Sequence, residues 1–278
     1  MANYIGHYRA AVTYAERGFE LTVGQMPSAA VHCQSWKALG LFRLGEWDLF
    51  LEAFAVLQDL LGDRRNDPPY FASLPFGAAA LVHVIQGDDP AADRVFAVID
   101  YLSARKGPRM ESMRGLGALA LARRGEFDRA RQLLRAIATE KAAELAPVVL
   151  LVECELIGEE RDWQRIPGVL EDARTASATG QLLALPAFAD RLQGRWHLAE
   201  GRPEQAAPSL QQAREVFERI EAKWEVACTD LDLARVFVET GDPGRARDLL
   251  ESTTAVFEAL SSRRELAAAR ELLSRTTA

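Results

Sequence analysis

A short phrase that recurs about every 40 residues constrains this chain more than any other feature of its sequence. The phrase is a turn residue, a polar residue, an aromatic residue or proline, one or two charged residues, and then an apolar residue. Its clearest copy is Gly125-Glu126-Phe127-Asp128-Arg129-Ala130. Copies begin at positions 6, 45, 87, 125, 161, 201 and 241, so the steps are 39, 42, 38, 36, 40 and 40 residues. A near-constant step of this size predicts structural units that stack along the chain.

Each phrase lies between two helical patterns. Apolar residues that follow the phrase recur at helical spacing, and after Gly125 they are Ala130, Leu133, Leu134 and Ile137. A turn glycine ends one helix by adopting a left-handed conformation. Pro203 and Pro243 follow two of the turns and suit the first turn of a helix, where no amide donor is lost. The phrase therefore predicts a helical hairpin.

Small residues stand seven positions before each of the last six turns, and we expect them to let two helices pack closely. They are Ala38, Ala80, Ala118, Cys154, Gly194 and Ala234. With the spacing of the phrases, they predict an all-α fold of stacked antiparallel helix pairs.

The pattern resembles the tetratricopeptide repeat (TPR) family over nearly the whole chain. The resemblance rests on the small residues of the first helix and on the turn residue with an aromatic residue two positions on, as at Tyr8, Trp47, Phe127 and Trp163. The step is nearer 40 than the family's usual ~34 residues, and a proline that ends each unit is mostly absent. The resemblance implies a right-handed α-solenoid, a TPR-like superhelix.

The long helices further resemble the TPR arrays of MalT-like signal-transduction ATPases and of bacterial ATPase–cyclase regulators. Segment 222–273 carries most of this likeness. It implies a bacterial protein of signal transduction or transcription regulation.

We expect a single helical-repeat domain over residues 1–278. Its predicted units are a half repeat at 1–26, then 27–66, 67–106, 107–143, 144–182, 183–222 and 223–260, and a cap helix at 261–278.

The first unit has only its second helix, from about Tyr8 to Val23. Natural repeat arrays end in polar caps, and the side chains of Tyr4, Tyr8, Val12 and Phe19 make a poor one. We therefore expect either that the chain is a fragment of a longer protein or that this helix packs on a partner, as in a homodimer. A short aromatic cap without a partner is the alternative.

The net charge, the cysteine count and the lengths of the apolar runs argue against several classes of function. The formal net charge is −7 and the isoelectric point is near 5.3, which disfavours nucleic-acid binding because that affinity depends on cationic residues. Three cysteines far apart in sequence do not form a disulfide framework. We find neither a signal peptide nor an apolar run of about 18 residues, and expect a cytoplasmic setting and no membrane partner.

No catalytic motif is present, and we predict neither enzymatic activity nor a cofactor or metal site. The segment Gly115-Leu116-Gly117-Ala118-Leu119-Ala120 matches a loose dinucleotide fingerprint. Such a site requires a strand before the glycines, whereas these glycines fall inside a helical pattern. We therefore interpret them as packing residues.

The first helix of each unit should line the concave face of a solenoid. This register predicts a ligand or peptide site made of Ser35, Leu39, Phe42, Glu155, Glu159, Arg191, Arg195 and Arg235. Arg191 and Arg195 share a helix face, and Arg235 occupies the matching place in the next unit. Together they could hold a carboxylate or phosphate. The alternative is that they pair with Glu155, Glu159 or Glu239, or are solvated.

A repeat array without a catalytic constellation indicates a non-catalytic interaction module. We expect it to bind a peptide, a partner protein or a small effector on its concave face. The alternative function is a self-association scaffold that acts through the incomplete N-terminal repeat.

Overall fold

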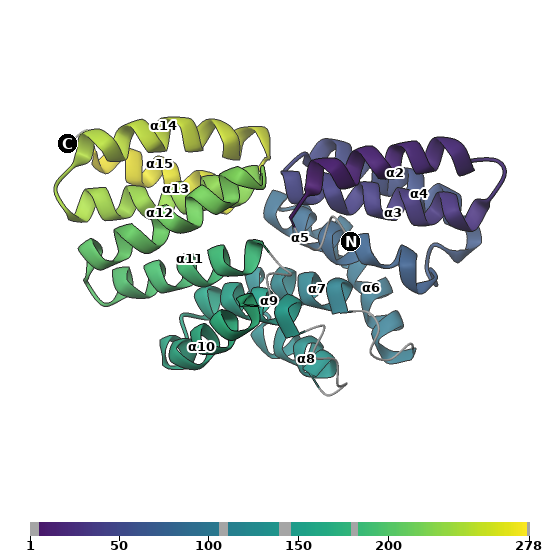
Figure 1. Cartoon of the computed structure of the whole chain (residues 1–278), viewed down its shortest axis with the longest axis horizontal. Helices are drawn as coiled ribbons and strands as arrows, with labels where there is room; N and C mark the ends of the chain where they lie inside the picture. Colours follow the sequence, from purple (N-terminus) through teal and green to yellow (C-terminus); the bar gives the residue numbers. More distant parts are fainter. Residues whose placement is uncertain (1–5, 106–110, 139–145, 179–182, 277–278) are drawn as a thin grey trace. The chain divides into compact units, whose positions relative to one another are not determined.

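The computed structural model describes residues 6–105, 111–138, 146–178 and 183–276. Within these ranges it has 14 α-helices and no strand. The helices pack as neighbouring antiparallel pairs joined by short turns (Figure 1). The predicted all-α fold class is therefore confirmed.

The chain divides into two compact units, residues 1–152 and 153–278. The division falls within helix α9 (Ala146–Glu160). The single-domain organisation and the repeat limits expected from the sequence remain predictions.

The first unit is a series of helices in which each packs against a neighbour along the chain. α2 packs on α3, α3 on α4, α5 on both α6 and α7, and α7 on α8. Two short 3-10 turns, η1 and η2, connect α4 to α5. The bounds are α2 (Tyr8–Thr22), α3 (Pro27–Leu44), α4 (Trp47–Leu61), η1 (Gly62–Arg64), η2 (Tyr70–Ala72), α5 (Leu74–Gln86), α6 (Asp89–Arg105), α7 (Glu111–Arg123) and α8 (Phe127–Ala138).

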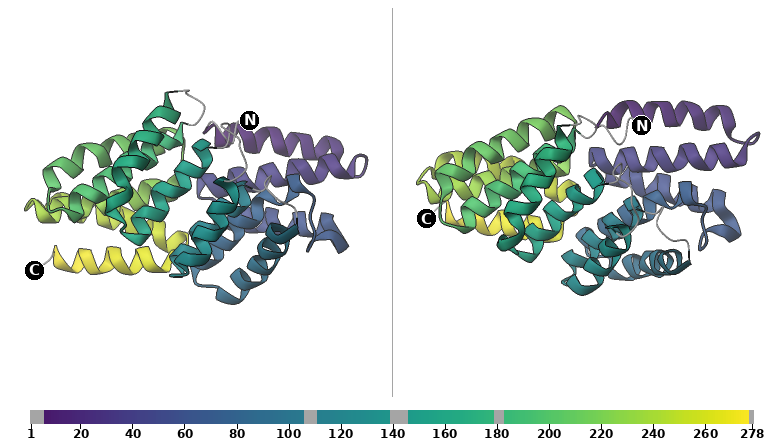
Figure 2. Two further views of the ribbon diagram at one scale, coloured as in Figure 1. Left: turned by 90° about the horizontal axis from the view of Figure 1, so that it is seen from below. Right: turned by 60° about the horizontal axis from the view of Figure 1, so that its bottom comes forward.

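The second unit begins in the last part of α9 and continues the same arrangement. From α10 to α15 each helix packs against the next, and the additional views of Figure 2 show these hairpins lying side by side. The bounds are η3 (Trp163–Arg165), α10 (Ile166–Ser177), α11 (Ala184–Ala199), α12 (Pro203–Arg219), α13 (Lys223–Glu239), α14 (Pro243–Ala259) and α15 (Arg263–Arg275).

The turn residues adopt the left-handed conformation that the sequence predicts. Positive φ angles occur at all seven predicted positions: Gly6 94°, Gly45 72°, Gly87 71°, Gly125 80°, Arg161 55°, Gly201 67° and Gly241 77°. The turn lets a backbone amide cap the preceding helix, since the Asp242 N–H donates to the Phe237 carbonyl at 2.8 Å. Pro203 and Pro243 lie in the first turn of their helices, as predicted.

The small residues before the turns lie in the helix contacts. Ala38, Ala80, Ala118, Cys154 and Ala234 are fully buried, and a Cβ added to Gly194 would meet the Leu210 side chain at 2.5 Å. Cys154 is thus a core residue, as expected, and its burial raises the pKa of its thiol.

Burial also repeats with the 40-residue step in the second unit. Ala206, Leu210 and Phe217 of α12 are fully buried, and so are their counterparts Ala246, Leu250 and Phe257 of α14. Identical or equivalent side chains thus fill equivalent places in successive hairpins, which is the structural meaning of the sequence repeat.

The first helix is held within its own chain. Tyr8 and Val12 are buried where α2 packs on α3, and Phe19 is half-buried. Tyr4, the remaining side chain of the four that make a poor polar cap, lies outside the described residues. The face of α2 turned away from α3 exposes Tyr14 and Leu21, whose exposed fractions are 73% and 67%.

Two other expectations concern single elements. Gly115 and Gly117 lie inside α7, where an added Cβ would meet Val152 and Ile99 respectively, so both act as packing residues. Within the described ranges no helix is long and apolar enough to cross a bilayer.

We predict that Gly77→Ala destabilises the protein by about 1–3 kcal/mol, because a Cβ at this α5 position would overlap the Met113 carbonyl oxygen of α7. The matched control is Gly168→Ala in α10, where a Cβ meets nothing within 4 Å. There the better helix propensity of alanine should stabilise by up to about 1 kcal/mol. Urea unfolding followed by circular dichroism measures both. Equal stability of the two variants would contradict the close α5–α7 approach.

Candidate functional site

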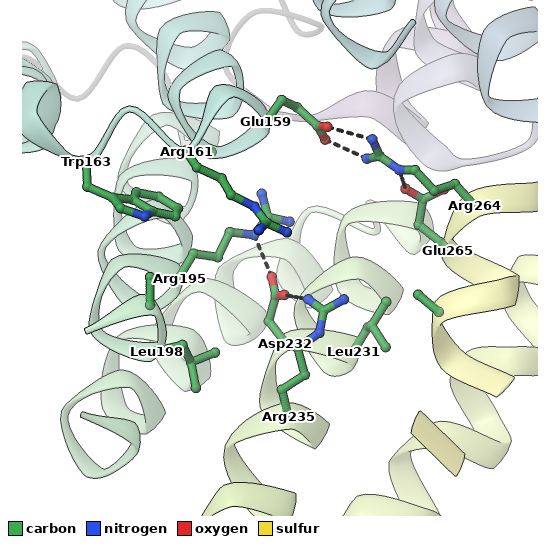
Figure 3. Close-up of a pocket in the computed structure, with 13 residues that line it drawn as sticks. Glu159, Arg161, Trp163, Arg195, Leu198, Leu231, Asp232, Arg235, Arg264 and Glu265 are labelled. Carbon is green, nitrogen blue, oxygen red and sulfur yellow. Dashed lines mark hydrogen bonds and ion pairs between the residues drawn. The ribbon is translucent and has the colours of Figure 1, made fainter. Parts of the chain in front are cut away.

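The second unit contains a pocket of about 740 Å³ (Figure 3). Its walls come from α9, α11 and α13, which are the first helices of three successive predicted repeats, from α15, which is the predicted cap helix, and from the turn after α9. Apolar side chains share the lining with charged ones. The lining residues are Gly158, Glu159, Arg161, Trp163, Arg195, Leu198, Ala199, Leu231, Asp232, Arg235, Arg264, Glu265 and Ala268.

Behind the pocket lies a fully buried arginine. The Arg191 guanidinium contacts Glu155 at 2.9 Å and Glu225 at 2.6 Å, and these carboxylates come from α9 and α13. Its centre also lies 5.0 Å and 4.9 Å from the rings of Phe188 and Phe217. Burial by itself would lower the pKa of Arg191, but Glu155 and Glu225 raise it above its ordinary value. Arg191 is thus a permanent cation that ties three helices together.

A second group of charges continues this network to the pocket wall. The Arg195 Nε donates to Asp232 at 2.6 Å, and its NH1 lies 3.6 Å from Glu155. Asp232 also accepts from Arg235, one helical turn further along α13. Burial would raise the pKa of Asp232, but Arg195 and Arg235 hold it below its ordinary value. Asp232 is therefore a fixed anion that positions both arginines.

A third ion pair lies across the pocket between α9 and α15. Two nitrogens of Arg264 donate to the two carboxylate oxygens of Glu159, each at 2.7 Å. The Arg264 Nε donates to Glu265, which also accepts from the Ser262 hydroxyl. This bidentate pair connects residues 105 positions apart in the chain. All three nitrogens of the Arg264 guanidinium thus donate to carboxylates.

Arg161 differs from these arginines. Its side chain is exposed and points into the pocket (Figure 3), and within the described residues its guanidinium makes neither an ion pair nor a hydrogen bond. Trp163 lies two residues on and forms part of the wall beside it. Arg161 is also the turn residue of its repeat, with a left-handed backbone.

The site residues expected from the sequence fall in different places. Ser35, Leu39 and Phe42 lie in α3 of the first unit and are buried, and the Ser35 hydroxyl donates to the Val31 carbonyl at 2.9 Å. In the second unit the structure brings together the other five predicted residues. They are Glu155, Glu159, Arg191, Arg195 and Arg235. Their role in binding remains a prediction.

Arg191 and Arg195 are paired with carboxylates, as the alternative interpretation of the sequence expected. Glu155 is a partner of both, and Asp232, which was not among the expected partners, pairs with Arg195 and Arg235. Three pocket residues, Arg161, Arg264 and Asp232, were not among those predicted from the sequence. One signal for Arg161 was present, since arginine replaces the glycine of the repeated turn.

The described residues contain no group of three or more His, Cys, Asp or Glu side chains that could hold a metal ion. The pocket instead combines arginine forks, carboxylates and an aromatic wall. Such a set recognises a polar or charged ligand by hydrogen bonds and ion pairs, next to apolar surface.

The fold is that of a TPR-like helical-repeat protein. No family model and no curated protein sequence matches the chain. Among solved structures, it is similar to the crystal structure of a Rap protein complexed with competence and sporulation factor. The TM-score is 0.60 at 12% sequence identity, and the match covers 98% of this chain and 80% of that one.

We predict that Arg191→Met destabilises the protein by about 3–5 kcal/mol, because it leaves Glu155 and Glu225 as buried charges without their partner. The control is Arg270→Met, whose pair with Glu258 is exposed on both sides and should contribute about 0–1 kcal/mol. Urea unfolding measures the difference. A cost for Arg191→Met no larger than that of the control would show that the buried network does not hold these helices.

Proposed function

We propose that this chain is a non-catalytic interaction module that binds a peptide or a segment of a partner protein in the pocket of its second unit. The observation that carries the proposal is the pocket itself, which is walled by the first helices of three successive hairpins and by the cap helix α15. Its volume of about 740 Å³ falls within the range of ligand sites.

The lining supports a peptide-like ligand more than a purely apolar one. Leu198, Leu231 and Trp163 offer apolar contact, while Arg161, from the turn after α9, and Arg235, from α13, offer hydrogen-bond donors. A peptide presents both kinds of group on neighbouring residues. The similar Rap protein is complexed with a factor, which supports a partner-binding role for this fold.

We place the module in a bacterial regulatory protein of the cytoplasm, in signal transduction or transcription regulation. The support is the resemblance of its long repeats to the MalT-like arrays. A small effector is a further candidate ligand, since the pocket is large enough for one.

We predict that Ala268→Trp abolishes binding of peptides selected by the wild-type chain from a phage-displayed random library. Ala268 is half-buried in the pocket wall on α15, so a large ring there fills the pocket without entering the core. The matched control is Ala267→Trp, which places the same ring on the exposed face of the same helix. Fluorescence anisotropy measures the affinities. Equal binding by both variants, or no selected peptide, would contradict the proposal.

Self-association through the N-terminal helix is the second candidate, and the exposed side chains of α2 favour it. Tyr14 and Leu21 are seven residues apart and so share a helix face, and Met26 follows with an exposed fraction of 59%. A cluster of large exposed apolar side chains is typical of a protein contact surface.

We predict that, if this face mediates association, Leu21→Lys shifts the chain from dimer to monomer in sedimentation-velocity runs. A lysine ammonium is costly to bury in an apolar contact. Ser252→Lys adds the same charge to an exposed position of α14 and should leave the dimer intact. A wild-type chain that stays monomeric at high concentration would remove this candidate.

A further inference from the structure

One residue departs from the repeat at a cost in backbone free energy. At the turn between paired helices the other phrases have glycine, whereas position 161 has arginine with a φ of 55°. An L-residue in this conformation is less stable than glycine. Among the described residues, the other non-glycine positions with positive φ are Glu221 and Ser261, in the connections that follow α12 and α14. Backbone strain of this kind gathers at functional sites.

The side chain of Arg161 carries a set of unused donors. Five N–H groups of an arginine can donate, and those of Arg161 make no hydrogen bond within the described ranges. Arg235, on the facing helix α13, uses one nitrogen for Asp232, and the rest of its guanidinium has no partner in the described part of the chain. Arg195 and Arg264, by contrast, are held by carboxylates.

The pocket lining also carries more positive than negative charge. Its charged residues are the cations Arg161, Arg195, Arg235 and Arg264 and the anions Glu159, Asp232 and Glu265. The excess is one positive charge, and it corresponds to Arg161, whose side chain has no carboxylate partner among the described residues. One negative charge on a ligand would neutralise this excess.

We propose that Arg161 and Arg235 form an anion subsite that binds a carboxylate of an acidic peptide. The proposal rests on the proposed function, because it names the ligand group that the pocket selects. Arg161 supplies a free planar fork that matches a carboxylate in bidentate geometry. Asp232 holds Arg235 in place from behind, and Trp163 covers the neighbouring apolar part of the ligand.

The test uses Arg161→Gly in the full chain. This variant removes the cation and restores the residue that the turn conformation favours, so its thermal midpoint should be equal to or higher than that of the wild type. Ser261→Gly relieves the same backbone strain on an exposed residue outside the pocket lining and serves as the matched control. If Arg161→Gly loses binding and Ser261→Gly keeps it, the loss is due to the missing guanidinium and not to a change in folding.

The probes are glutarate, inorganic phosphate and a selected peptide with its acidic residue changed to the amide. Side-chain Nε–Hε resonances of arginine, followed by NMR, report binding of the small anions. We expect the wild type and Ser261→Gly to bind glutarate, and Arg161→Gly to bind it at least tenfold more weakly. Arg235→Gln should weaken it to a smaller extent. The amide peptide should lose about tenfold in affinity for the wild type and nothing for Arg161→Gly.

Three outcomes would overturn the inference. One is glutarate binding that Arg161→Gly leaves unchanged, another is no binding by the wild type, and the third is phosphate binding that excludes glutarate, which would indicate a phosphate ester as ligand. Selected peptides that bind the wild type and Arg161→Gly equally would leave the proposed function standing without this subsite. If glutarate binding depends on Arg161 but no peptide is selected, the anion subsite stands and the proposed peptide-binding function fails.

Discussion

The helical hairpins of this protein depend on a turn in which one residue adopts a left-handed backbone. That conformation lets two amides past the helix end bond back to its last carbonyls, so the chain reverses within a few residues and the next helix begins at once. With short turns, neighbouring helices must pack antiparallel, and small side chains such as Ala118 and Ala234 let them approach. The turn thus fixes the direction of the second helix, and the small residues fix the distance between the two helices.

The second unit buries charged side chains in the contacts between its helices. Glu155, Arg191 and Asp232 are buried, yet each has partners of opposite charge on neighbouring helices. A buried ion pair gains little over apolar packing, but it strongly penalises any arrangement in which one partner is missing. The network therefore specifies how α9, α11 and α13 fit together. The same arrangement leaves the arginines at its edge facing the pocket.

The proposed anion subsite depends on which arginine charges the network neutralises and which it leaves without a carboxylate partner. Carboxylates hold Arg195 and Arg264 in place, whereas Arg161 extends from a strained turn into the pocket, with no partner among the described residues. We propose that a site with a fixed wall and one unmatched charge selects its ligand by charge and shape. This is the physical basis on which we propose a binding role.

The sequence by itself determined the all-α hairpin fold, because helix periodicity, turn residues and small contact residues are local features that repeat. It also placed Glu159, Arg195 and Arg235 among the candidates, because the repeat register predicts which residues of each first helix face the concave surface. Only the tertiary structure decided which charges are matched: Glu159 meets Arg264 from 105 residues away, and Asp232 holds Arg195 and Arg235. Ion pairing depends on distances of a few ångströms between side chains on different helices, and no local pattern in the chain encodes them.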